Sequence, residues 1–494
     1  MKRYYLGLDN GTTGTTALLL DENWKQVGRG YREVSQRYPQ DGYAEQDAEE
    51  IWRSLQDAAL DACRDAGIEP SQIACVGLDN VGETVVLWDK VTGKPVGPAI
   101  GWQDRRTAAL CEELEKTHGG FVRERAGIGI DSYFSATKLR WIIDNVAGVK
   151  EGIAAGRILG GTLDGWLIWK LTGGKANATD PSTASRTLLM NFKTGEWDDE
   201  LLRLFGVPRE ILPEIRGNAA LRGDTDPDAF LGVSIPVSGA AVDQQAALFG
   251  QACLRPGMVK CTYGTGCFLL MQTGERPAVS THGLLTTVAW KLDGKLQYAL
   301  DGGVYVAGAA TQWLRDNLGI IASASETEQL ALDAGSNGGV YFVPAFSGLG
   351  APHWDPRARG AILGLTGGTT REQLVRATLE ATAYQVRDVF DAMCADAGMP
   401  IERLRADGGA AVNGFLMQFQ ADLLGVPVDV PEITETTAFG AAYLAAIGIK
   451  AASAQALPEH WKLAHSFEPK MGEDERQALL RGWRRAVETV KRIS

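Results

Sequence analysis

The sequence predicts an α/β protein of two domains that share an internally duplicated fold. With 494 residues, the chain is longer than one hydrophobic core usually organises, so two domains are expected. A strand, a Gly/Thr-rich turn and a second strand occur near the N-terminus and again at Lys260–Met271, which indicates duplication. Between the halves, Gln251–Gly257 lacks periodicity and ends in Pro-Gly. We therefore predict domains at 1–252 and 253–494.

The first repeat places D9-N-G-T-T-G-T-T16 between two apolar strands, Tyr4–Leu8 and Ala17–Leu20. Glycine lets the backbone approach an anion closely, and four threonines add O–H donors, so the turn is suited to phosphate. Asp9, at the strand end, is placed to hold Mg²⁺ directly or through water. The alternative is a tight hairpin turn whose two glycines supply positive φ angles. Because the motif recurs, we expect a nucleotide between the halves.

Other segments complete an alternation of strands and helices. Strands are predicted at Ile73–Leu78, Thr84–Trp88 and Gly425–Val430, and a closely packing helix of small residues at Ala438–Ala446. In Leu404–Gln420 a strand ends in Asp-Gly-Gly and leads into an amphipathic helix, whose N-terminal N–H groups are suited to phosphate. The sequence contains no G-x-x-x-x-G-K-[ST] and no dinucleotide fingerprint, which argues against P-loop and dinucleotide folds.

Ser238–Gly250, S-G-A-A-V-D-Q-Q-A-A-L-F-G, contains a candidate catalytic base. Asp243 ends an apolar strand where a helix begins, so its carboxylate is expected at the mouth of a site. There it is suited to accept a proton from a substrate hydroxyl held within about 3 Å. The alternative is that Asp243 is only the N-cap of the following helix.

Composition narrows the functional class. The 49 basic and 61 acidic residues give a net charge of −12, which argues against nucleic acid or an anionic membrane as partner. The seven cysteines are scattered without a C-x-x-C, and the five histidines include no H-E-x-x-H, so neither zinc nor a disulfide framework is expected. No signal peptide and no apolar run of about 20 residues is found, and we expect a cytoplasmic protein.

With these motifs assembled, the chain resembles the FGGY family of ATP-dependent sugar and polyol kinases, and within it the glycerol kinases. The resemblance covers nearly the whole length. The matching stretches are L-G-L-D-N-G-T-T near the N-terminus, W-D-K-V-T-G-K-P-V through W-Q-D-R-R-T (88–107), Y-F-S-A-T-K-L-R-W-I (133–142), D-Q-Q-A-A-L-F-G-Q from Asp243, Y-G-T-G-C-F from Tyr263 and F-S-G-L-G-A-P-H-W-D-P-R-A-R-G from Phe346.

The resemblance implies two actin-like (ribonuclease H-like, hexokinase-type) domains around a cleft that binds ATP and Mg²⁺. Asp243 would be the general base, and Asp9 with Asp243 would hold the metal. The polyol would bind in the first domain and the nucleotide mainly through the second. The implied polyol-binding residues are Glu83, Trp102, Tyr133, Asp243 and Gln244. The implied nucleotide-binding residues are Thr12, Thr13, Thr265, Gly308, Gln312, Gly409 and Asn413.

Several of these residues have plainer interpretations. Glu83 begins a strand, where an acid is usually solvated, and Trp102 and Tyr133 are of types that commonly fill a core. The run Asp104-Arg105-Arg106 reads equally well as a surface ion-pair run.

The chain departs from the glycerol-kinase pattern at three places. Where those enzymes read N-Q-R-E-T, this chain reads Asn80-Val-Gly-Glu-Thr84, so a substrate-binding arginine is replaced by Gly82. The missing side chain is expected to leave space for one or two more carbons of substrate. Thr16 replaces an arginine near the phosphates. The segment 218–235 lacks the basic Gly-rich loop that binds a sugar bisphosphate, so that regulation is expected to be absent. Apart from these three, Gly414 stands where family members often carry asparagine, which affects the adenine pocket.

Three functions follow as hypotheses. The first is ATP-dependent phosphorylation of glycerol or a related short polyol or sugar. The second is a kinase of the same family acting on a different substrate, such as a ketopentose or tetritol. The third is a non-catalytic, actin-like ATP-binding protein, against which the retained Asp243 argues. A homodimer is a family-level expectation.

Overall fold

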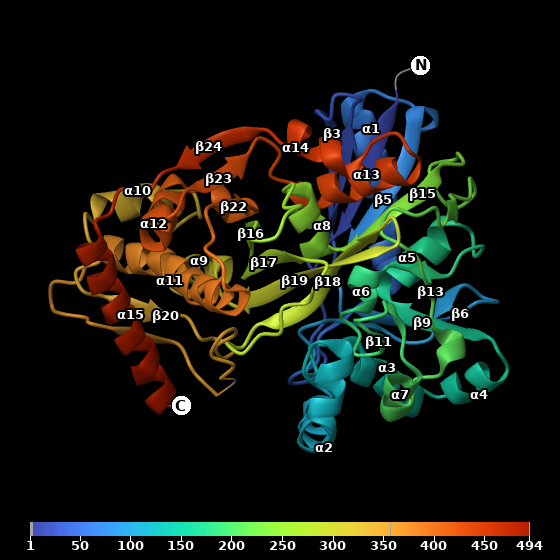
Figure 1. The fold of residues 1–494 in the computed structure, drawn as a ribbon, viewed down its shortest axis with the longest axis horizontal. Helices are drawn as coiled ribbons and strands as arrows, with labels where there is room; N and C mark the ends of the chain where they lie inside the picture. The colour runs from blue at the N-terminus through green and yellow to red at the C-terminus, as the bar shows by residue number, and fades with distance from the viewer. Residues whose placement is uncertain (1–2, 356, 494) are drawn as a thin grey trace. The chain divides into compact units, whose positions relative to one another are not determined.

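Two β-sheets with matching topology form the framework of this computed structural model, which describes residues 3–355 and 357–493. The first sheet contains β1 (Tyr4–Asn10), β2 (Gly14–Leu20), β3 (Gln26–Glu33), β5 (Ile73–Asn80), β14 (Gly223–Asp224) and β15 (Pro236–Val242). The second contains β16 (Val259–Tyr263), β17 (Cys267–Gly274), β18 (Leu285–Leu292), β19 (Lys295–Val304), β22 (Leu404–Asp407), β23 (Val428–Pro431) and β24 (Leu463–Phe467). The strand orders are β14-β15-β5-β1-β2-β3 and β18-β19-β17-β16-β22-β23-β24 (Figure 1).

The two sheets repeat one motif. Strands β1 and β2 form an antiparallel hairpin, and β5 and then β15 continue the sheet parallel to β1. In the second sheet β16 and β17 form the hairpin, and β22 and β23 continue parallel to β16. The duplication predicted from the two Gly/Thr turns is therefore confirmed.

The chain divides into two compact units that are not contiguous in sequence. The first unit runs to Ala252 and also includes Thr287–Tyr298 and Glu435–Trp461. The second consists of Cys253–Thr286, Ala299–Thr434 and the chain from Lys462 onward. The functional domains 1–252 and 253–494 stay a prediction.

The remaining elements surround the two sheets. Helices of the first unit are α1 (Ala48–Ala66), α2 (Ala108–Ala126), α3 (Ser135–Asn145), α4 (Val149–Ala154), α5 (Leu163–Leu171), α6 (Pro181–Ala184), α7 (Asp199–Phe205), α8 (Asp243–Gly250), α13 (Thr436–Gly448) and α14 (Leu457–His460). Its small strands are β4 (Glu45–Gln46), β6 (Val85–Asp89), β7 (Lys94–Pro95), β8 (Ala99–Ile100), β9 (Ile158–Thr162), β10 (Ala178–Thr179), β11 (Met190–Asn191), β12 (Glu196–Trp197) and β13 (Glu214–Ile215). The second unit adds α9 (Gly308–Asp316), α10 (Glu326–Asp333), α11 (Arg371–Ala397), α12 (Gly414–Leu424), α15 (Glu473–Ile493), β20 (Tyr341–Val343) and β21 (Ala361–Leu363).

Helix boundaries follow local chemistry. Helix α1 begins after Asp47, whose carboxylate accepts hydrogen bonds from the N–H groups of Glu49 and Glu50. It ends at Gly67, which adopts the left-handed conformation with φ 63°. Its buried face, which includes Ile51 and Leu55, joins the hydrophobic core beneath the first sheet.

Helix α13 packs directly on the first sheet, as its small residues predict. Gly7, Gly77 and Gly239 lie on the neighbouring strands β1, β5 and β15. A Cβ atom at any of the three would collide with backbone atoms of α13. The close contact therefore requires glycine on the sheet, and it holds a segment late in the chain against the first unit's sheet.

Among the described residues, no helix combines the length and apolarity needed to cross a bilayer. All seven cysteines are free, and six of them are buried.

Candidate active site

Asp243 is positioned by the junction between β15 and α8. Strand β15 ends at Val242, paired with Asn80 of the adjacent β5, and Asp243 is the first residue of the helix. Its Oδ1 accepts a hydrogen bond from the Gln244 N–H at 2.7 Å, and its Oδ2 one from Gln244 Nε2 at 3.2 Å. The helix is capped at Val242 without a side-chain hydrogen bond, so the predicted alternative of an Asp243 N-cap is wrong.

Two further acids lie in the same unit, of which Asp79 is fully buried and Asp9 is partly buried. Asp9 and Asp79 are in register on the neighbouring parallel strands β1 and β5. Burial raises the pKa of Asp9 to about 7, and nearby Glu435 and Asp243 add to the increase. Burial and the charge of Asp9 raise the pKa of Asp79 well above its usual value. Both carboxyl groups therefore favour the protonated form in the folded protein, chiefly because of burial and then because of neighbouring carboxylates.

The acid group fits a divalent cation only in part. No group of three His, Cys, Asp or Glu side chains in the described residues has metal-binding geometry. Mg²⁺ is commonly held by one or two carboxylates together with substrate phosphates and water, so one or two acids suffice. Sequence reasoning missed Asp79. The signal was available, because the predicted strand Ile73–Leu78 ends next to it and lies beside the strand that ends in Asp9.

The first Gly/Thr turn is shorter than predicted. The strands extend into it, β1 to Asn10 and β2 from Gly14, because β-branched threonines favour the extended backbone. Neither Gly11 nor Gly14 has a positive φ, so that alternative is wrong. A Cβ at Gly14 would instead lie 2.6 Å from the Tyr31 hydroxyl oxygen and the Arg32 carbonyl oxygen, so glycine is needed for close packing.

The threonines of this turn have different environments. Thr12 Oγ1 accepts a hydrogen bond from Trp102 Nε1 at 3.0 Å, which connects a predicted nucleotide contact to a predicted polyol contact. Thr13 stays in the turn, where its carbonyl accepts from the Val34 N–H. Thr15 is buried, and its hydroxyl bonds to Ser54 at 2.7 Å, so it belongs to the core.

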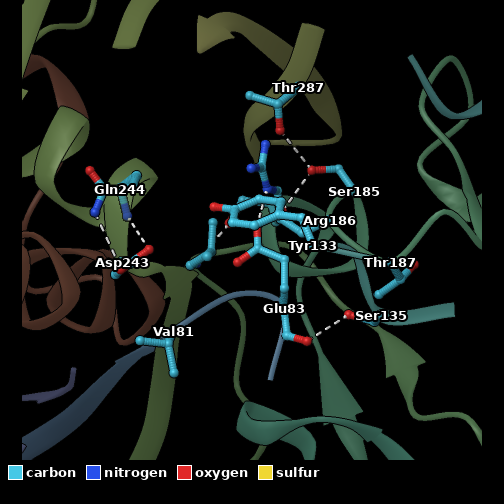
Figure 2. A network of polar contacts seen from close by, with 12 residues as sticks. Val81, Glu83, Tyr133, Ser135, Ser185, Arg186, Thr187, Asp243, Gln244 and Thr287 are labelled. Atoms are coloured by element: carbon cyan, nitrogen blue, oxygen red, sulfur yellow. Dashed lines mark hydrogen bonds and ion pairs between the residues drawn. The ribbon is translucent and has the colours of Figure 1, made fainter. Parts of the chain in front are cut away.

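Glu83, Tyr133 and Trp102 lie together in the first unit. Glu83 is 5% exposed and pairs with Arg186, with 2.6 Å between Oε1 and Nε (Figure 2). The expectation of a solvated strand-start acid is therefore wrong, because the turn between β5 and β6 folds inward. The rings of Tyr133 and Trp102 meet edge to face at 5.8 Å, and both residues are only partly buried, although Trp102 also packs against the hydrophobic core. Arg186 was not predicted from the sequence.

The run Asp104-Arg105-Arg106 is a surface ion-pair run only at Arg105, whose exposed guanidinium pairs with Asp131 at 3.0 Å. Asp104 is fully buried, and its Oδ2 accepts from the Ala44 N–H at 2.8 Å and pairs with Arg106 at 2.8 Å. The Arg106 guanidinium lies over the Tyr43 ring, 3.9 Å from its centroid. The Asp104–Arg106 pair therefore has a structural role, because it holds the segment containing Tyr43 and Ala44 in place.

The space next to Gly82 is occupied. A Cβ built on Gly82 would overlap Cγ2 of Val242 and lie 3.3 Å from Cγ of Arg186. The predicted room for extra substrate carbons is therefore absent at this position, because neighbouring side chains fill it.

A pocket of about 510 Å³ opens in the second unit. It contains all five nucleotide-binding residues predicted in that half: Thr265, Gly308, Gln312, Gly409 and Asn413. The β16–β17 turn forms one wall, where the Gly264 carbonyl accepts from the Gly308 N–H at 3.1 Å. A Cβ at Gly308 would lie 2.5 Å from that carbonyl oxygen, so α9 approaches the turn only because residue 308 is glycine.

The opposite wall is formed by a short turn and α12. The predicted direct entry from strand into helix is wrong, because a 3₁₀ turn at Gly409–Val412 intervenes. Asn413 then caps α12, its Oδ1 accepting from the Leu416 N–H at 2.9 Å, and its Nδ2 donates to Thr327 Oγ1 at 3.1 Å. A Cβ at Gly414 would lie 2.7 Å from Glu328 Oε1, so Glu328 lines the space left by the absent side chain.

A doubled α/β framework, a carboxylate at a strand–helix junction in one unit and a Gly/Thr-lined pocket in the other define a kinase of carbohydrates or polyols. Comparisons with known sequences agree. The N-terminal domain profile of the FGGY family of carbohydrate kinases matches residues 4–250, and the C-terminal domain profile matches residues 259–449. The chain belongs to the FGGY family of carbohydrate kinases.

Full-length relatives and solved structures support this assignment. The chain is 54% identical to "Glycerol kinase 2" of Thermotoga maritima over 98% of both chains, and 52% identical to a Bacillus licheniformis glycerol kinase over 99% of both. Its structure resembles that of Plasmodium falciparum glycerol kinase with ADP, with a TM-score of 0.89 and 35% identity over 99% of this chain and 98% of that one. A xylulose kinase from Rhodospirillum rubrum gives a TM-score of 0.84 at 25% identity, with 99% of each chain covered.

Proposed function

We propose that this protein transfers the γ-phosphoryl group of ATP to a hydroxyl group of glycerol. The observation that carries the proposal is the identity of more than half of the residues, over almost the full length, with a protein named glycerol kinase. The ADP-bound Plasmodium falciparum structure supports ATP as the phosphoryl donor. The grouping of Glu83, Tyr133 and Trp102 in the first unit supports a small polyol as acceptor.

In the proposed reaction Asp243 is the general base. One of its carboxylate oxygens takes the proton of the attacking hydroxyl while the polyol oxygen bonds to the γ-phosphorus and the bond to the β-phosphate oxygen breaks, releasing ADP. Glu83 and Gln244 bind the polyol hydroxyls, and the rings of Tyr133 and Trp102 cover its C–H edges. Positioning of the two substrates supplies a large part of the rate enhancement.

Nucleotide binding is assigned to the second-unit pocket with Thr12 and Thr13 of the first turn. The glycines at 308 and 409 allow close approach to phosphates, and Asn413, Thr265 and Gln312 supply polar contacts. Asp9 and Asp243 would hold Mg²⁺, with Asp79 behind Asp9, since their excess negative charge suits a cation. Bound Mg²⁺ would neutralise developing charge on the phosphates.

Further expectations belong to this proposal. The functional domains would be 1–252, which binds the polyol and carries the base, and 253–494, which binds mainly the nucleotide. The free cysteines suit a cytoplasmic location, and a homodimer is expected from the family. A ketopentose or tetritol kinase is the weaker alternative, because its main support was the supposed space beside Gly82. A non-catalytic ATP-binding protein would not need Asp243.

The experiment is ADP release by purified protein with Mg-ATP and one acceptor at a time: glycerol, erythritol, threitol, xylitol, ribitol, xylulose, ribulose or dihydroxyacetone. We expect glycerol to give the highest kcat/KM. Asp243→Asn should lower kcat about 10²- to 10⁴-fold with little change in KM for ATP. A ketose or longer polyol as best acceptor would replace glycerol in the proposal. Turnover without any acceptor, or full activity of the Asp243 variant, would refute the kinase mechanism.

A further inference from the structure

Arg186 is a buried cation in the first unit that no sequence motif had identified. It is 4% exposed, and its Nε donates to Glu83 Oε1 at 2.6 Å. Its guanidinium carbon lies 5.6 Å from the ring centroid of Tyr133 and 5.4 Å from that of Phe134. Figure 2 shows the Arg186 and Glu83 side chains directed at each other beside the Tyr133 ring. A carboxylate and two aromatic rings therefore fix the plane of this guanidinium.

The backbone around Arg186 is held as firmly as its side chain. Arg186 follows the short helix α6, whose N-cap Asp180 accepts hydrogen bonds from the N–H groups of Ser182 and Thr183. The Arg186 N–H donates to the Thr183 carbonyl at 3.0 Å. The preceding Ser185 bonds through its hydroxyl to Thr287 Oγ1 at 3.0 Å (Figure 2). A residue anchored on both sides in this way is suited to precise recognition of a small ligand.

Gly82 and Arg186 are complementary in space. The hypothetical Cβ of residue 82 would touch the aliphatic stem of Arg186 and overlap Val242, the residue immediately before Asp243. The guanidinium of Arg186 thus extends past a position that has no side chain of its own. Any larger residue at 82 would displace either Arg186 or the start of α8.

We propose that Arg186 is a specificity-determining residue of the polyol site, supplying through its terminal Nη groups the hydroxyl donor that Gly82 lacks. This inference rests on the proposed function and names a residue of the same site. Arg186 Nε donates to Glu83, and the planar fork of a guanidinium is suited to donate to a hydroxyl oxygen as well. The Glu83 carboxylate accepts the hydrogen of a neighbouring hydroxyl. The pair therefore selects vicinal hydroxyls on a short chain.

The test compares three acceptors that differ by single hydroxyls: glycerol, propane-1,2-diol and propane-1,3-diol. Wild type and Arg186→Lys are assayed with saturating Mg-ATP. Lysine keeps the positive charge near Glu83, so folding is preserved better than with alanine. It lacks the planar set of N–H donors that the guanidinium provides. Arg157→Lys serves as the matched control, because Arg157 also pairs with an acid of the first unit, Asp89, but is half-exposed.

We expect Arg186→Lys to lower kcat/KM for glycerol about 10- to 100-fold, with KM for ATP within about twofold of wild type. For the diol that lacks the hydroxyl bound by Arg186, the same substitution should lower kcat/KM by no more than about threefold. This acceptor has no hydroxyl for the guanidinium to bind, so replacing the guanidinium changes little. The control should match wild type throughout. An equal loss on all three acceptors would show a purely structural role and overturn the assignment.

Two further outcomes are decisive. If wild type phosphorylates none of the three acceptors, the proposed function fails and the Arg186 assignment falls with it, whereas the preceding outcome removes the assignment alone. Gly82→Arg, which restores the glycerol-kinase residue, should lower kcat/KM for glycerol because Val242 and the Arg186 stem occupy its path. A gain in kcat/KM for this variant would show that the donor belongs at position 82, against the proposal.

Discussion

Asp9 and Asp79 are in register on the parallel strands β1 and β5, and the charge of Asp9 adds to burial in raising the pKa of Asp79. Burial and mutual repulsion both favour the protonated form of these carboxyl groups. Among the described residues, no hydrogen-bond donor reaches either carboxyl oxygen of Asp79. Ionisation of these two carboxyl groups therefore destabilises the folded protein. The proposed reaction would need a cation at the same position.

Asp79→Asn should stabilise the metal-free protein, and increasingly so as the pH rises. The pKa of Asp79 is raised in the folded state, so its contribution to stability is fully present below about pH 4, the ordinary range of an aspartate, and is lost as the pH rises toward the folded pKa. Asparagine has no proton to lose. The free-energy difference should grow by about 1.4 kcal/mol per pH unit within this window.

The measurement is the difference in melting temperature between Asp79→Asn and wild type at pH 5, 6, 7 and 8 without nucleotide or Mg²⁺. Comparing the two proteins at each pH cancels the titration of other groups. A difference that is constant with pH would mean that Asp79 is not held neutral by the fold. Activity of the variant should fall, since the buried acid supports Asp9.

The pH–rate profile should report the titration of Asp9. Burial raises its pKa to about 7, and a carboxyl group must lose its proton before it can bind a cation. We expect kcat/KM for Mg-ATP to fall about tenfold per pH unit below 7. The corresponding fall in kcat should begin at lower pH, because bound Mg²⁺ favours the ionised carboxylate.

Asp89→Asn provides the comparison, because the pKa of Asp89 is lowered by backbone and Arg157 hydrogen bonds and it lies outside the proposed site. This variant should keep the acidic limb at the same pH. If kcat and kcat/KM began to fall at the same acidic pH, the result would contradict a role for Asp9 in metal binding.

The sequence predicted those features that depend on local pattern. Both Gly/Thr hairpins, the Asp243 junction and the small-residue helix Ala438–Ala446 follow from residues adjacent in the chain, and the structure contains all of them. The grouping of Thr265, Gly308 and Asn413 in one pocket depended on the family resemblance, because no local pattern connects residues so far apart.

The features that sequence reasoning missed depend on contacts between distant segments. Arg186 meets Glu83 across 103 positions of the chain, and no motif around either residue indicates the other. The space beside Gly82 was misjudged for the same reason, since Val242 and Arg186 reach it from other elements. Helix α13 belongs to the first unit although it lies late in the chain. A single domain boundary near Gly257 could not predict this.

Gly409→Ala should weaken ATP binding without weakening the fold. A Cβ at this position meets nothing within 4 Å, and the backbone conformation is ordinary, so the nucleotide-free protein should melt as wild type does. Because Gly409 lines the proposed phosphate side of the pocket, the methyl group would occupy space needed by the ligand. We expect KM for ATP to rise about tenfold, equivalent to about 1.4 kcal/mol, with KM for glycerol unchanged.

Gly308→Ala is the companion variant, because its Cβ would press on the Gly264 carbonyl even without ligand. It should lose both melting temperature and ATP affinity. Equal behaviour of the two variants in the nucleotide-free protein would contradict the distinction between a ligand-facing glycine and a packing glycine.

Gly77→Ala and Gly120→Ala should change stability in opposite directions. A Cβ on Gly77 would collide with the backbone of α13 at Ala441, which cannot move aside as a side chain can, so we expect a loss of about 3 kcal/mol or more. Gly120 is exposed within α2 and has nothing within 4 Å of its Cβ position. Alanine there should stabilise by about 0.5–1 kcal/mol through helix propensity. Denaturant unfolding followed by circular dichroism measures both, and a tolerated Gly77→Ala would show that α13 does not need its close seat on the sheet.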